Sequence, residues 1–368
     1  MSTTRTAAKV VGLAAAAVGL ATAGVAAGAA LRKKRSSMAR PELDSLDKLG
    51  SLRGPAATVL TEDGVALYAE VDDVDLPQPV RGRRSRRRTA DPTVVYVHGY
   101  ALNLRVWHFQ RRELRGRVRQ VFYDQRSHGR SGRSESRRCT AEQLGRDLLR
   151  VLDELAPAGP VVLVGHSMGG MTILALAGQH PEIFGPRVVG VALLSASAGD
   201  MHELTFGLPG FSGRLVNRLT PSAMAVLARA PGFVESGRRA GSALGFAITR
   251  RVAFGGPVPA SYVEFTDEML AGTPIEVVAD FFPIFDSYDA YAAVPALQGV
   301  PTLILCGTED VVTPVRHTRA IADLLPSATV REIEGAGHMV LLERHHEVSQ
   351  ALADLVDPYL SQAQAAEA

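Results

Sequence analysis

The chain of 368 residues has only two cysteines, Cys139 and Cys306, and a single tryptophan. Two cysteines are too few for a disulfide scaffold or for a zinc site made of four cysteines. Charged residues make up 21% of the chain and hydrophobic residues 46%. This mixture excludes a chain that is disordered throughout, a collagen and a membrane protein with many spans. The sequence therefore predicts a globular protein that can bury a sizeable core.

Acidic residues are outnumbered in the first part of the chain. Residues 1–150 contain 28 Lys and Arg against 15 Asp and Glu, a net charge of +13, whereas residues 151–368 contain 12 against 23, a net charge of −11. No aromatic platform or recognition-helix pattern accompanies these arginines, so we expect no nucleic-acid partner. A solvated basic surface, including the run from Arg81 to Arg88 in an exposed loop, is the first interpretation. Attraction to anionic lipid headgroups is the alternative.

Charge is absent altogether from residues 10–31, a stretch of 22 residues with basic residues on both sides. A helix of this length just spans the hydrocarbon core of a bilayer. We therefore predict that residues 1–40 form an N-terminal membrane anchor with its basic flank. A cleaved signal peptide, with Ala21-Thr22-Ala23 as its cleavage site, and a soluble alanine-rich tail are the alternatives. More basic residues follow the stretch than precede it, which favours a membrane-associated protein with a cytoplasmic C-terminal domain. A cleaved signal would instead give a secreted protein.

Beyond residue 41, short apolar runs alternate with stretches of helical periodicity. Two β-branched runs around Glu62-Asp63-Gly64 predict a hairpin. Six further strands are expected at Thr93–Val97, Val118–Tyr123, Pro160–Val164, Val188–Leu194, Pro301–Cys306 and Thr329–Ile333. Helices are expected at Ala141–Leu155, Met168–Gln179, Val315–Leu325 and Glu343–Leu360. This alternation predicts an α/β fold with a mostly parallel, doubly wound sheet that is covered by helices on both faces.

No strand is expected between Gly199 and Gln298, where helical stretches are broken by Pro and Gly. Nine of the twelve phenylalanines of the chain lie in this region. We therefore predict a core made of residues 41–198 and 299–368, with a helical insertion at 199–298 that forms a lid over a pocket. An ordinary helical subdomain with a phenylalanine core is the alternative.

The most specific motif is Gly165-His166-Ser167-Met168-Gly169, which stands between an apolar strand and a predicted helix. This is the G-x-S-x-G pattern in the strand, turn and helix context that it requires. The glycines are needed because a strained turn that presents Ser167 leaves no room for a Cβ on either side. The helix that begins at Met168 would direct backbone N–H groups at an oxyanion beside the serine. The pattern predicts an activated serine nucleophile.

Together with four further motifs, this pattern resembles the α/β-hydrolase fold superfamily, in particular its lid-bearing serine esterase and lipase branch. The motifs are His98-Gly99-Tyr100, Asp124-Gln125-Arg126-Ser127-His128-Gly129-Arg130-Ser131, Gly307-Thr308-Glu309-Asp310 and Gly335-Ala336-Gly337-His338. Each follows an apolar run, and they match the family's HG-x oxyanion loop, its D-x-R-x-H-G-x-S loop, its G-x-x-D acid loop and its G-x-H base loop. The resemblance covers residues 56–360.

The resemblance implies a catalytic triad of Ser167 as nucleophile, Asp310 as acid and His338 as base, in the chain order of this fold. It also implies an oxyanion hole made by the backbone N–H groups of Tyr100 and Met168. General chemistry agrees, because a serine hydroxyl needs a base to take its proton and the imidazole needs a carboxylate to fix its tautomer.

Other residues of these motifs are expected to support the loops. They are His98, Gly99, Asp124, Arg126, His128, Gly165 and Gly169. His98 is alternatively a second base, and Arg126 is alternatively a contact for an acidic substrate. Glu309 and Asp200 are alternative triad acids. We expect His166 to be structural and the two histidines at 345–346 to be solvated.

A serine at position 167 disfavours the epoxide hydrolases and haloalkane dehalogenases of this fold, which use Asp, and the dienelactone-type enzymes, which use Cys. The resemblance therefore implies an esterase or lipase that needs no metal or organic cofactor. The phenylalanine-rich insertion and the predicted membrane anchor favour a small, lipophilic acyl ester as the substrate. Alternatives on the same triad are a cofactor-free perhydrolase, a C–C bond hydrolase, a thioesterase and a peptidase. The alternative from another class is a membrane-tethered binding module without turnover, whose usual mark is the loss of a triad residue.

Overall fold

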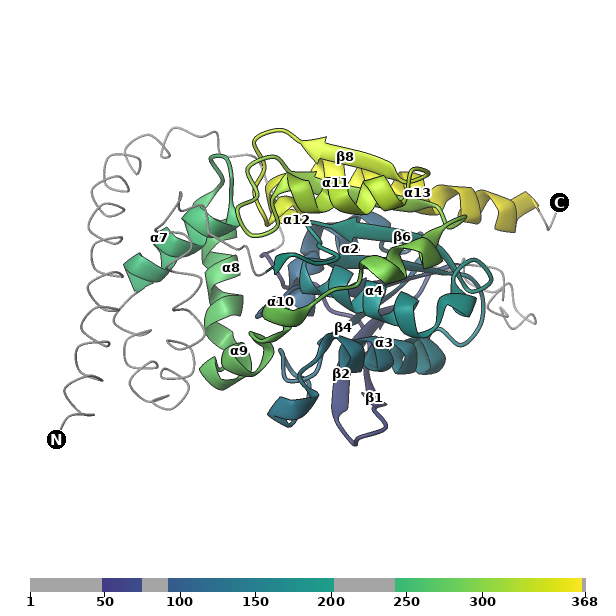
Figure 1. Ribbon diagram of the computed structural model, residues 1–368, viewed down its shortest axis with the longest axis horizontal. Coiled ribbons are helices and arrows are strands. Elements are labelled where there is room, and N and C mark those ends of the chain that lie inside the picture. The colour runs from purple at the N-terminus through teal and green to yellow at the C-terminus, as the bar shows by residue number, and fades with distance from the viewer. Residues whose placement is uncertain (1–47, 75–91, 202–241, 366–368) are drawn as a thin grey trace, which may run out of the picture.

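The computed structural model describes residues 48–74, 92–201 and 242–365 (Figure 1). The predicted segment 1–40, the arginine run at 81–88 and the first part of the predicted lid, 202–241, lie outside these ranges. Within the described ranges, no helix has the length and hydropathy needed to cross a bilayer. The anchor predicted at residues 10–31 lies elsewhere in the chain and stays a prediction.

A sheet in the order β1-β2-β4-β3-β5-β6-β7-β8 forms the centre of the molecule. Its strands are β1 (Ala56–Leu60), β2 (Ala66–Asp72), β3 (Thr93–Val97), β4 (Arg119–Tyr123), β5 (Val161–His166), β6 (Val188–Leu194), β7 (Thr302–Gly307) and β8 (Thr329–Ile333). β2 is antiparallel to both of its neighbours, and every other neighbouring pair is parallel. The predicted hairpin and the six strands after it are therefore confirmed.

Helices flank the strands. The α-helices are α2 (His108–Leu114), α3 (Ala141–Leu155), α4 (Met168–Gln179), α7 (Ser242–Ala253), α8 (Ala260–Gly272), α9 (Ile275–Phe281), α10 (Ile284–Ser287), α11 (Val315–Leu324), α12 (Val340–Glu343) and α13 (His345–Ala365). Short 3-10 helices are η1 (Leu104–Trp107), η2 (Ser136–Arg138), η3 (Pro181–Ile183) and η5 (Tyr291–Leu297). The four predicted helices are α3, α4, α11 and α13, and in the core the short helices α2 and α12 are additions.

Both faces of the sheet are covered, because parallel strands carry apolar side chains on each side. On one face, α2 and α13 pack against a core that includes Tyr96 and Phe122. On the other face, α3, α4 and α11 pack against a core that includes Val95 and Val97. In Figure 1, α3 and α4 lie in front of the sheet and α2 lies behind it. The predicted α/β fold with a doubly wound sheet is thus confirmed.

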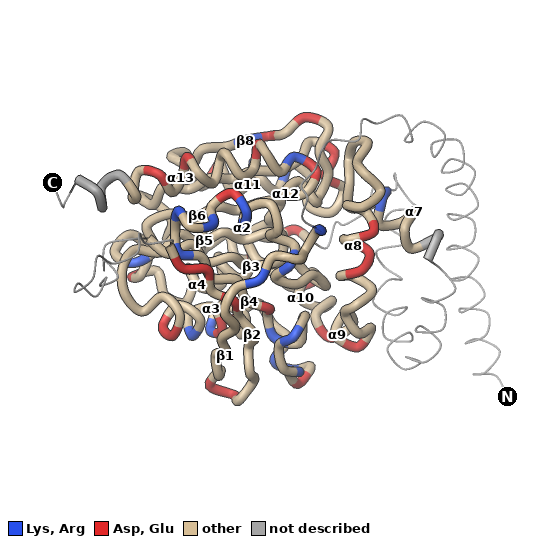
Figure 2. The backbone as a smooth tube through the Cα atoms, turned by 180° about the vertical axis from the view of Figure 1, so that it is seen from behind, with Lys and Arg blue, Asp and Glu red and all other residues tan. Residues whose placement is uncertain are grey.

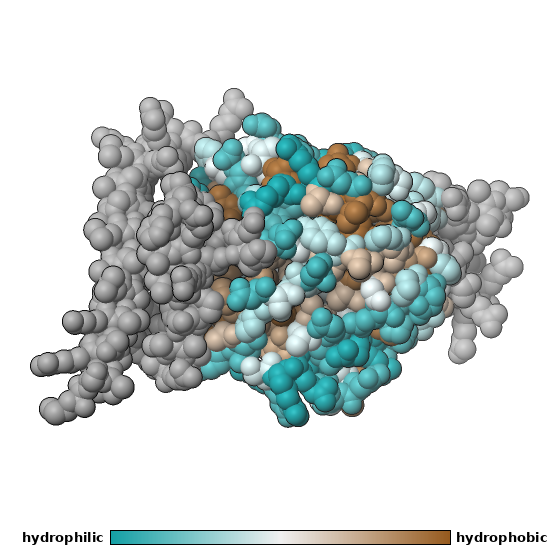
Figure 3. All heavy atoms as spheres, in the orientation of Figure 1, coloured by the Kyte–Doolittle hydropathy of each residue, from teal (hydrophilic) through white to brown (hydrophobic). Residues whose placement is uncertain are grey.

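Charge and hydropathy follow this layering. The central strands β3 and β5 carry no Lys, Arg, Asp or Glu, and the coloured segments of the tube in Figure 2 lie mostly on the surrounding helices and loops. On the face in Figure 3, hydrophilic residues lie mostly along the upper and lower edges, and more hydrophobic residues gather across the middle. The large hydrophobic side chains that are exposed in the described ranges are Leu60, Ile248, Leu324 and Val330.

One histidine departs from its expected environment. His346 is exposed as predicted, but His345 is buried. Its ring stacks on Phe109 of α2, with 3.8 Å between the ring centroids. The prediction for His345 is wrong because α13 packs along α2, a contact that the pattern of α13 alone does not reveal.

The described residues between β6 and β7 form helices and no strand. Helices α7, α8 and α9 stand beside one end of the sheet, in the green part of Figure 1. We call α7 to α10, with their connections, the α7–α10 segment (residues 242–287). The next element, η5, packs instead against α4 and contributes Val294 and Leu297 to the core.

Candidate active site

Ser167 occupies the turn between β5 and α4. Its backbone has φ 53° and ψ −119°, a strained conformation for a residue with a side chain. A Cβ on Gly165 would lie 2.6 Å from the backbone of Gly169, and a Cβ on Gly169 would lie 2.0 Å from the carbonyl oxygen of Val97 in β3. Close backbone approach therefore requires both glycines, and the turn places Ser167 at the carboxyl edge of the sheet.

Three side chains from the ends of β5, β7 and β8 meet at this edge. His338 Nε2 lies 3.0 Å from Ser167 Oγ, and His338 Nδ1 lies 2.9 Å from Asp310 Oδ2. The partners assign the tautomer, because Nδ1 must donate its proton to the carboxylate and Nε2 is then left to accept from the serine hydroxyl. The arrangement can transfer a proton from Ser167 to His338 while Asp310 stabilises the imidazolium.

Asp310 is held as an anion by its surroundings. Its Oδ1 accepts the backbone N–H groups of Val312 and Thr313, each at 2.8 Å, and Thr313 Oγ1 lies 2.8 Å from Oδ2. Burial by itself would raise the pKa of Asp310, but the neighbouring His338 and the donors of Thr313 outweigh it, so the pKa is lowered. The carboxylate is therefore available to His338 at neutral pH.

Neither of the two alternative acids forms a hydrogen bond or an ion pair with the His338 side chain, whose partners are Asp310, Thr313 and Ser167. Glu309 is exposed, and its backbone N–H donates a hydrogen bond to the carbonyl oxygen of Ala336 at 2.9 Å. The carboxylate of Asp200 accepts from the Tyr291 hydroxyl at 2.8 Å. The geometry therefore selects Asp310 among the three carboxylates.

The loop after β3 passes directly beside the nucleophile. A Cβ on Gly99 would lie 3.2 Å from Ser167 Cβ and 2.8 Å from His166 Nδ1, so a larger residue would collide with this turn. Tyr100 follows at once. Met168 is the first residue of α4, and its N–H has no acceptor within the helix. The two backbone segments expected to form an oxyanion hole thus adjoin Ser167.

His98 has both ring nitrogens engaged. Nδ1 lies 2.8 Å from the carbonyl oxygen of Gly99, and Nε2 accepts the backbone N–H of Gln125 at 2.9 Å. Burial lowers the pKa of His98 to about 3, so the ring is neutral. The Gln125 amide also donates to the carbonyl of His98 at 2.7 Å. His98 therefore ties two loops together and has no nitrogen left to serve as a second base.

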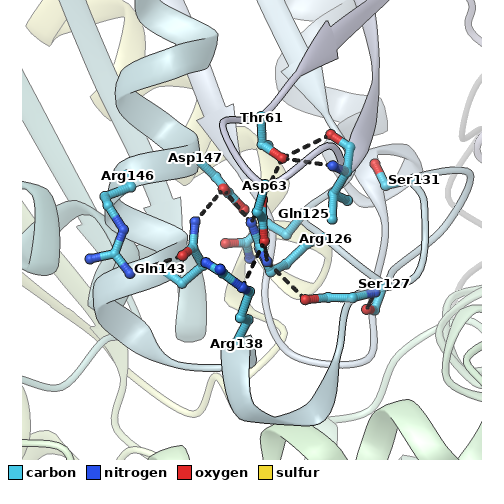
Figure 4. A network of polar contacts seen from close by, with 12 residues as sticks. Thr61, Asp63, Gln125, Arg126, Ser127, Ser131, Arg138, Gln143, Arg146 and Asp147 are labelled. Atoms are coloured by element: carbon cyan, nitrogen blue, oxygen red, sulfur yellow. Dashed lines mark hydrogen bonds and ion pairs between the residues drawn. The ribbon is translucent and has the colours of Figure 1, made fainter.

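Arg126 lies in a buried network of polar contacts (Figure 4). Nε and Nη2 donate to the two oxygens of Asp147 at 2.6 and 2.7 Å, and Nη1 and Nη2 donate to Asp63 at 3.0 Å. The remaining Nη1 proton goes to Ser134 Oγ at 2.8 Å. All five guanidinium N–H groups are used. Arg126 thus joins its loop to α3 and to the β1–β2 turn, and it has no donor left for an acidic substrate.

Asp124 and His128 order the same loop. The carboxylate of Asp124 accepts the backbone N–H groups of Leu104 and Arg130, each at 2.8 Å, and burial raises its pKa to about 6. His128 Nδ1 lies 2.9 Å from the carbonyl oxygen of Arg126, and burial lowers the pKa of His128 to about 4. These residues adjoin the site without reaching Ser167.

His166 is structural as expected, and two further residues at the site, Thr313 and Glu343, were not singled out from the sequence. His166 Nε2 lies 3.0 Å from the carbonyl oxygen of His338, so the residue before the nucleophile also holds the histidine loop. Thr313 also supports Asp310. The Asp310 side chain forms an Asx turn with the N–H of Val312, two residues on, and such local turns of Asp are the one signal that could have indicated support from this loop. Glu343 contacts the histidine loop through Gly337 at 2.8 Å.

The α7–α10 segment contacts the loops of the site. The Tyr100 hydroxyl donates to the carbonyl of Val278 in α9, and its ring packs edge-on to Phe285 of α10 at 5.0 Å between centroids. An apolar cluster joins Phe281 to Met168 and its neighbours at the start of α4. The described part of the insertion therefore supplies an apolar wall beside the turn that carries Ser167.

No group of three or more His, Cys, Asp or Glu residues in the described ranges is arranged to hold a metal ion. The donors that could bind a ligand at this edge are the hydroxyl, imidazole and backbone N–H groups described above.

Comparison with known proteins gives consistent matches. The family model described as alpha/beta hydrolase fold matches residues 92–345. An uncharacterised protein of Mycobacterium tuberculosis (strain ATCC 25618 / H37Rv) is 26% identical over 306 residues, which cover 78% of this chain and 81% of that protein. Two solved structures show the same fold. An esterase from Exiguobacterium antarcticum has a TM-score of 0.63 at 19% identity, covering 82% of this chain and 100% of that chain. An enol-lactonase from Burkholderia xenovorans LB400 has a TM-score of 0.60 at 25% identity, again covering 82% and 100%.

Proposed function

This chain belongs to the α/β-hydrolase fold family, and we propose that it is a serine hydrolase that cleaves carboxylic esters through an acyl-enzyme intermediate. The observation that supports the proposal most strongly is the linear set of contacts from Ser167 Oγ to His338 at 3.0 Å and from His338 to Asp310 at 2.9 Å. A binding module has no need of this arrangement, which activates a serine. The enol-lactonase among the structural neighbours supports an ester as the substrate class.

In the first half of the reaction, Ser167 Oγ attacks the acyl carbonyl carbon while its proton moves to His338 Nε2. The developing oxyanion lies within reach of the backbone N–H groups of Tyr100 and Met168, which stabilise it more strongly than the neutral carbonyl. Asp310 stabilises the imidazolium and keeps its Nδ1 proton in place. The C–O bond to the alcohol then breaks, and His338 returns the proton to the leaving oxygen.

In the second half, a water molecule attacks the acyl group on Ser167 and gives a proton to the neutral His338. The second tetrahedral intermediate releases the carboxylic acid and restores the serine hydroxyl with the proton from His338. Every proton in this cycle moves between substrate, water and residues of the chain, so the proposed reaction needs no metal or organic cofactor.

We also propose that the acyl group is lipophilic and that residues 199–298 act as a lid. Phe281, Phe285 and the ring of Tyr100 form an apolar wall beside the turn between β5 and α4. This wall favours a substrate with an apolar acyl chain over one with a polar acyl group. The alternatives on the same triad, namely a perhydrolase, a C–C bond hydrolase, a thioesterase and a peptidase, would use the same nucleophile and differ in the groups that the lid admits.

A third element of the proposal is the location of the protein. Residues 10–31 carry no charge and are flanked by basic residues, and we propose that they anchor the protein to a membrane. The basic cluster that follows favours a cytoplasmic side for the catalytic domain. An anchored enzyme would meet lipophilic esters at the bilayer surface, which agrees with the proposed substrate class.

Labelling by a fluorophosphonate probe tests the central proposal. The wild type should be labelled covalently, and Ser167→Ala should not be labelled and should lose ester hydrolysis, since only an activated serine reacts with the probe. Circular dichroism of both proteins is the control, because the substitution removes one hydroxyl and should leave the fold unchanged. Labelling that persists in Ser167→Ala, or a folded wild type that is never labelled, would contradict the proposal.

A further inference from the structure

Glu343, the last residue of α12, binds two separate parts of the chain with one carboxylate. Its Oε2 accepts the backbone N–H of Gly337, directly before His338, at 2.8 Å. The same oxygen accepts the N–H of Gly255, in the connection between α7 and α8, at 3.0 Å. Oε1 accepts the N–H of Gly256 at 2.6 Å. One side chain thus joins the histidine loop to the α7–α10 segment.

The two backbones touch at this point. A Cβ on Gly337 would lie 2.4 Å from the nitrogen of Gly255, and a Cβ on Gly255 would lie 2.6 Å from the carbonyl oxygen of Gly335. Only glycines allow such an approach, so side chains are excluded from the contact on both sides. The backbone N–H of Met339 adds a direct hydrogen bond to the carbonyl of Ala253 at 2.8 Å.

The connection between α7 and α8 is bound by a cation as well as by the carboxylate of Glu343. The guanidinium of Arg250 in α7 donates to the carbonyl oxygens of Phe254 and Gly256. The carbonyls of this short connection therefore face a cation and its N–H groups face the carboxylate of Glu343. Charge-assisted hydrogen bonds of this kind are stronger than those between neutral groups. The connection is thus fixed to α7 through Arg250 and to the histidine loop through Glu343.

We propose that Glu343 is a positioning residue that couples the α7–α10 segment to His338, so that the imidazole is held at Ser167 while this segment is docked. The inference rests on the proposed function and describes how the same site is regulated. When the segment moves away, Oε2 loses one of its two partners and the histidine loop loses a neighbour in direct contact. A shift of about 1 Å at a catalytic base can lower a rate about 100-fold, so this contact is able to control turnover.

The experiment compares Glu343→Ala, Glu343→Gln and the wild type as full-length proteins. Glu347→Ala is the matched control, because Glu347 is an exposed glutamate of α13 that faces Arg344 and lies outside the contact. The readouts are the rate of fluorophosphonate labelling, kcat and KM on p-nitrophenyl butyrate, and amide hydrogen exchange of peptides covering residues 253–258 and 335–339. All are measured well below the melting temperature of each variant.

Glu343→Ala should lower the labelling rate and kcat by about tenfold or more with KM within about twofold, because the base is displaced and the binding surface is retained. Exchange should rise in both peptides together. Glu343→Gln should recover part of the rate, since its amide oxygen can replace Oε2 while its NH₂ group opposes the N–H of Gly256. Glu347→Ala should match the wild type.

A labelling rate of Glu343→Ala within twofold of the wild type, or exchange that rises in only one of the two peptides, would overturn the role of Glu343 and leave the proposed function intact. A wild type that is not labelled would instead contradict the proposed function, and the exchange measurements would still decide whether the two segments are coupled. If Glu343→Ala does not fold, the same comparison with Glu343→Gln decides the question.

Discussion

His98, His128 and His166 are fully buried around the turn that carries Ser167, and burial lowers their pKa values to about 3, about 4 and about 3. A histidine in an unfolded chain has a pKa of about 6.5. Each of these rings therefore stays neutral in the folded protein at a pH where the unfolded chain would protonate it. Their hydrogen bonds hold loops together, and none of them competes with His338 for the proposed role of base.

This burial predicts that stability falls with falling pH. Below about pH 6.5 the unfolded chain binds protons that the three buried rings do not, so the stability that they contribute is complete above pH 6.5 and is lost as the pH falls toward 4. At pH 5 the loss is about 2 kcal/mol for each histidine. Asp124 acts in the opposite direction, because its raised pKa of about 6 lets the folded protein bind a proton at a higher pH than the unfolded chain does. At pH 5 this offsets about 1 kcal/mol of the loss in the free energy of unfolding.

Urea unfolding between pH 7.5 and pH 5 measures this dependence. The free energy of unfolding should decrease steadily over the range, and His128→Gln should reduce the slope by the share of one histidine. A free energy of unfolding that is constant between pH 7.5 and pH 5 would show that the rings become protonated in the folded state.

At the scale of elements, the junction between β5 and α4 depends on two glycines. We expect Gly169→Ala to lower the free energy of unfolding by about 3 kcal/mol, because the added Cβ would lie 2.0 Å from the Val97 carbonyl oxygen and β3 would have to move. Gly272→Ala at the end of α8 is the control, since its Cβ would meet no atom within 4 Å. Urea unfolding of both variants checks this, and similar values for the two would contradict the close packing.

From the apolar side chains of helices α9 and α10, we predict that kcat/KM is higher for esters with longer acyl chains. Their side chains form one apolar cluster with Met168 and Met171 at the start of α4, so a methylene group that enters beside them leaves water. Each buried CH₂ contributes about 0.8 kcal/mol, so kcat/KM for p-nitrophenyl esters should rise about fourfold per CH₂ from acetate until the wall is filled. A value of kcat/KM that is constant or falls from acetate to octanoate would point to a small polar acyl group.

At the scale of the whole molecule, the N-terminal segment and the α/β-hydrolase domain are expected to act separately. Deleting residues 1–40 should move the protein from the membrane fraction to the soluble fraction, because the only uncharged stretch of 22 residues is then gone. The kcat/KM on a soluble ester should stay within about twofold, since the family match begins at residue 92. Sedimentation with lipid vesicles measures the first effect. Binding that survives the deletion would assign it to the lid or to the basic surface.

The sequence was sufficient for the strands and for helices α3, α4, α11 and α13, because alternation of apolar runs and helical periodicity is a local property, whereas the short helices α2 and α12 were missed. It was also sufficient for the turn around Ser167, where the two glycines reflect backbone contacts that any such turn must make. The motifs that contain Asp310 and His338 each follow a predicted strand, so both residues were expected in loops at the carboxyl ends of strands. Since parallel strands end at one edge of a sheet, local motifs placed there are close in space even when they are 171 residues apart, as Ser167 and His338 are.

The tertiary structure alone decided which partners the supporting side chains meet. Arg126 meets Asp63 and Asp147 from two other elements, His345 is covered by Phe109, and Glu343 joins the histidine loop to the α7–α10 segment. Such contacts depend on where two distant parts of the chain cross, and no periodicity within either part records the crossing. Local sequence thus determined the elements and the turn that presents the serine, whereas the packing of elements determined what holds the serine, the histidine and the carboxylate in register.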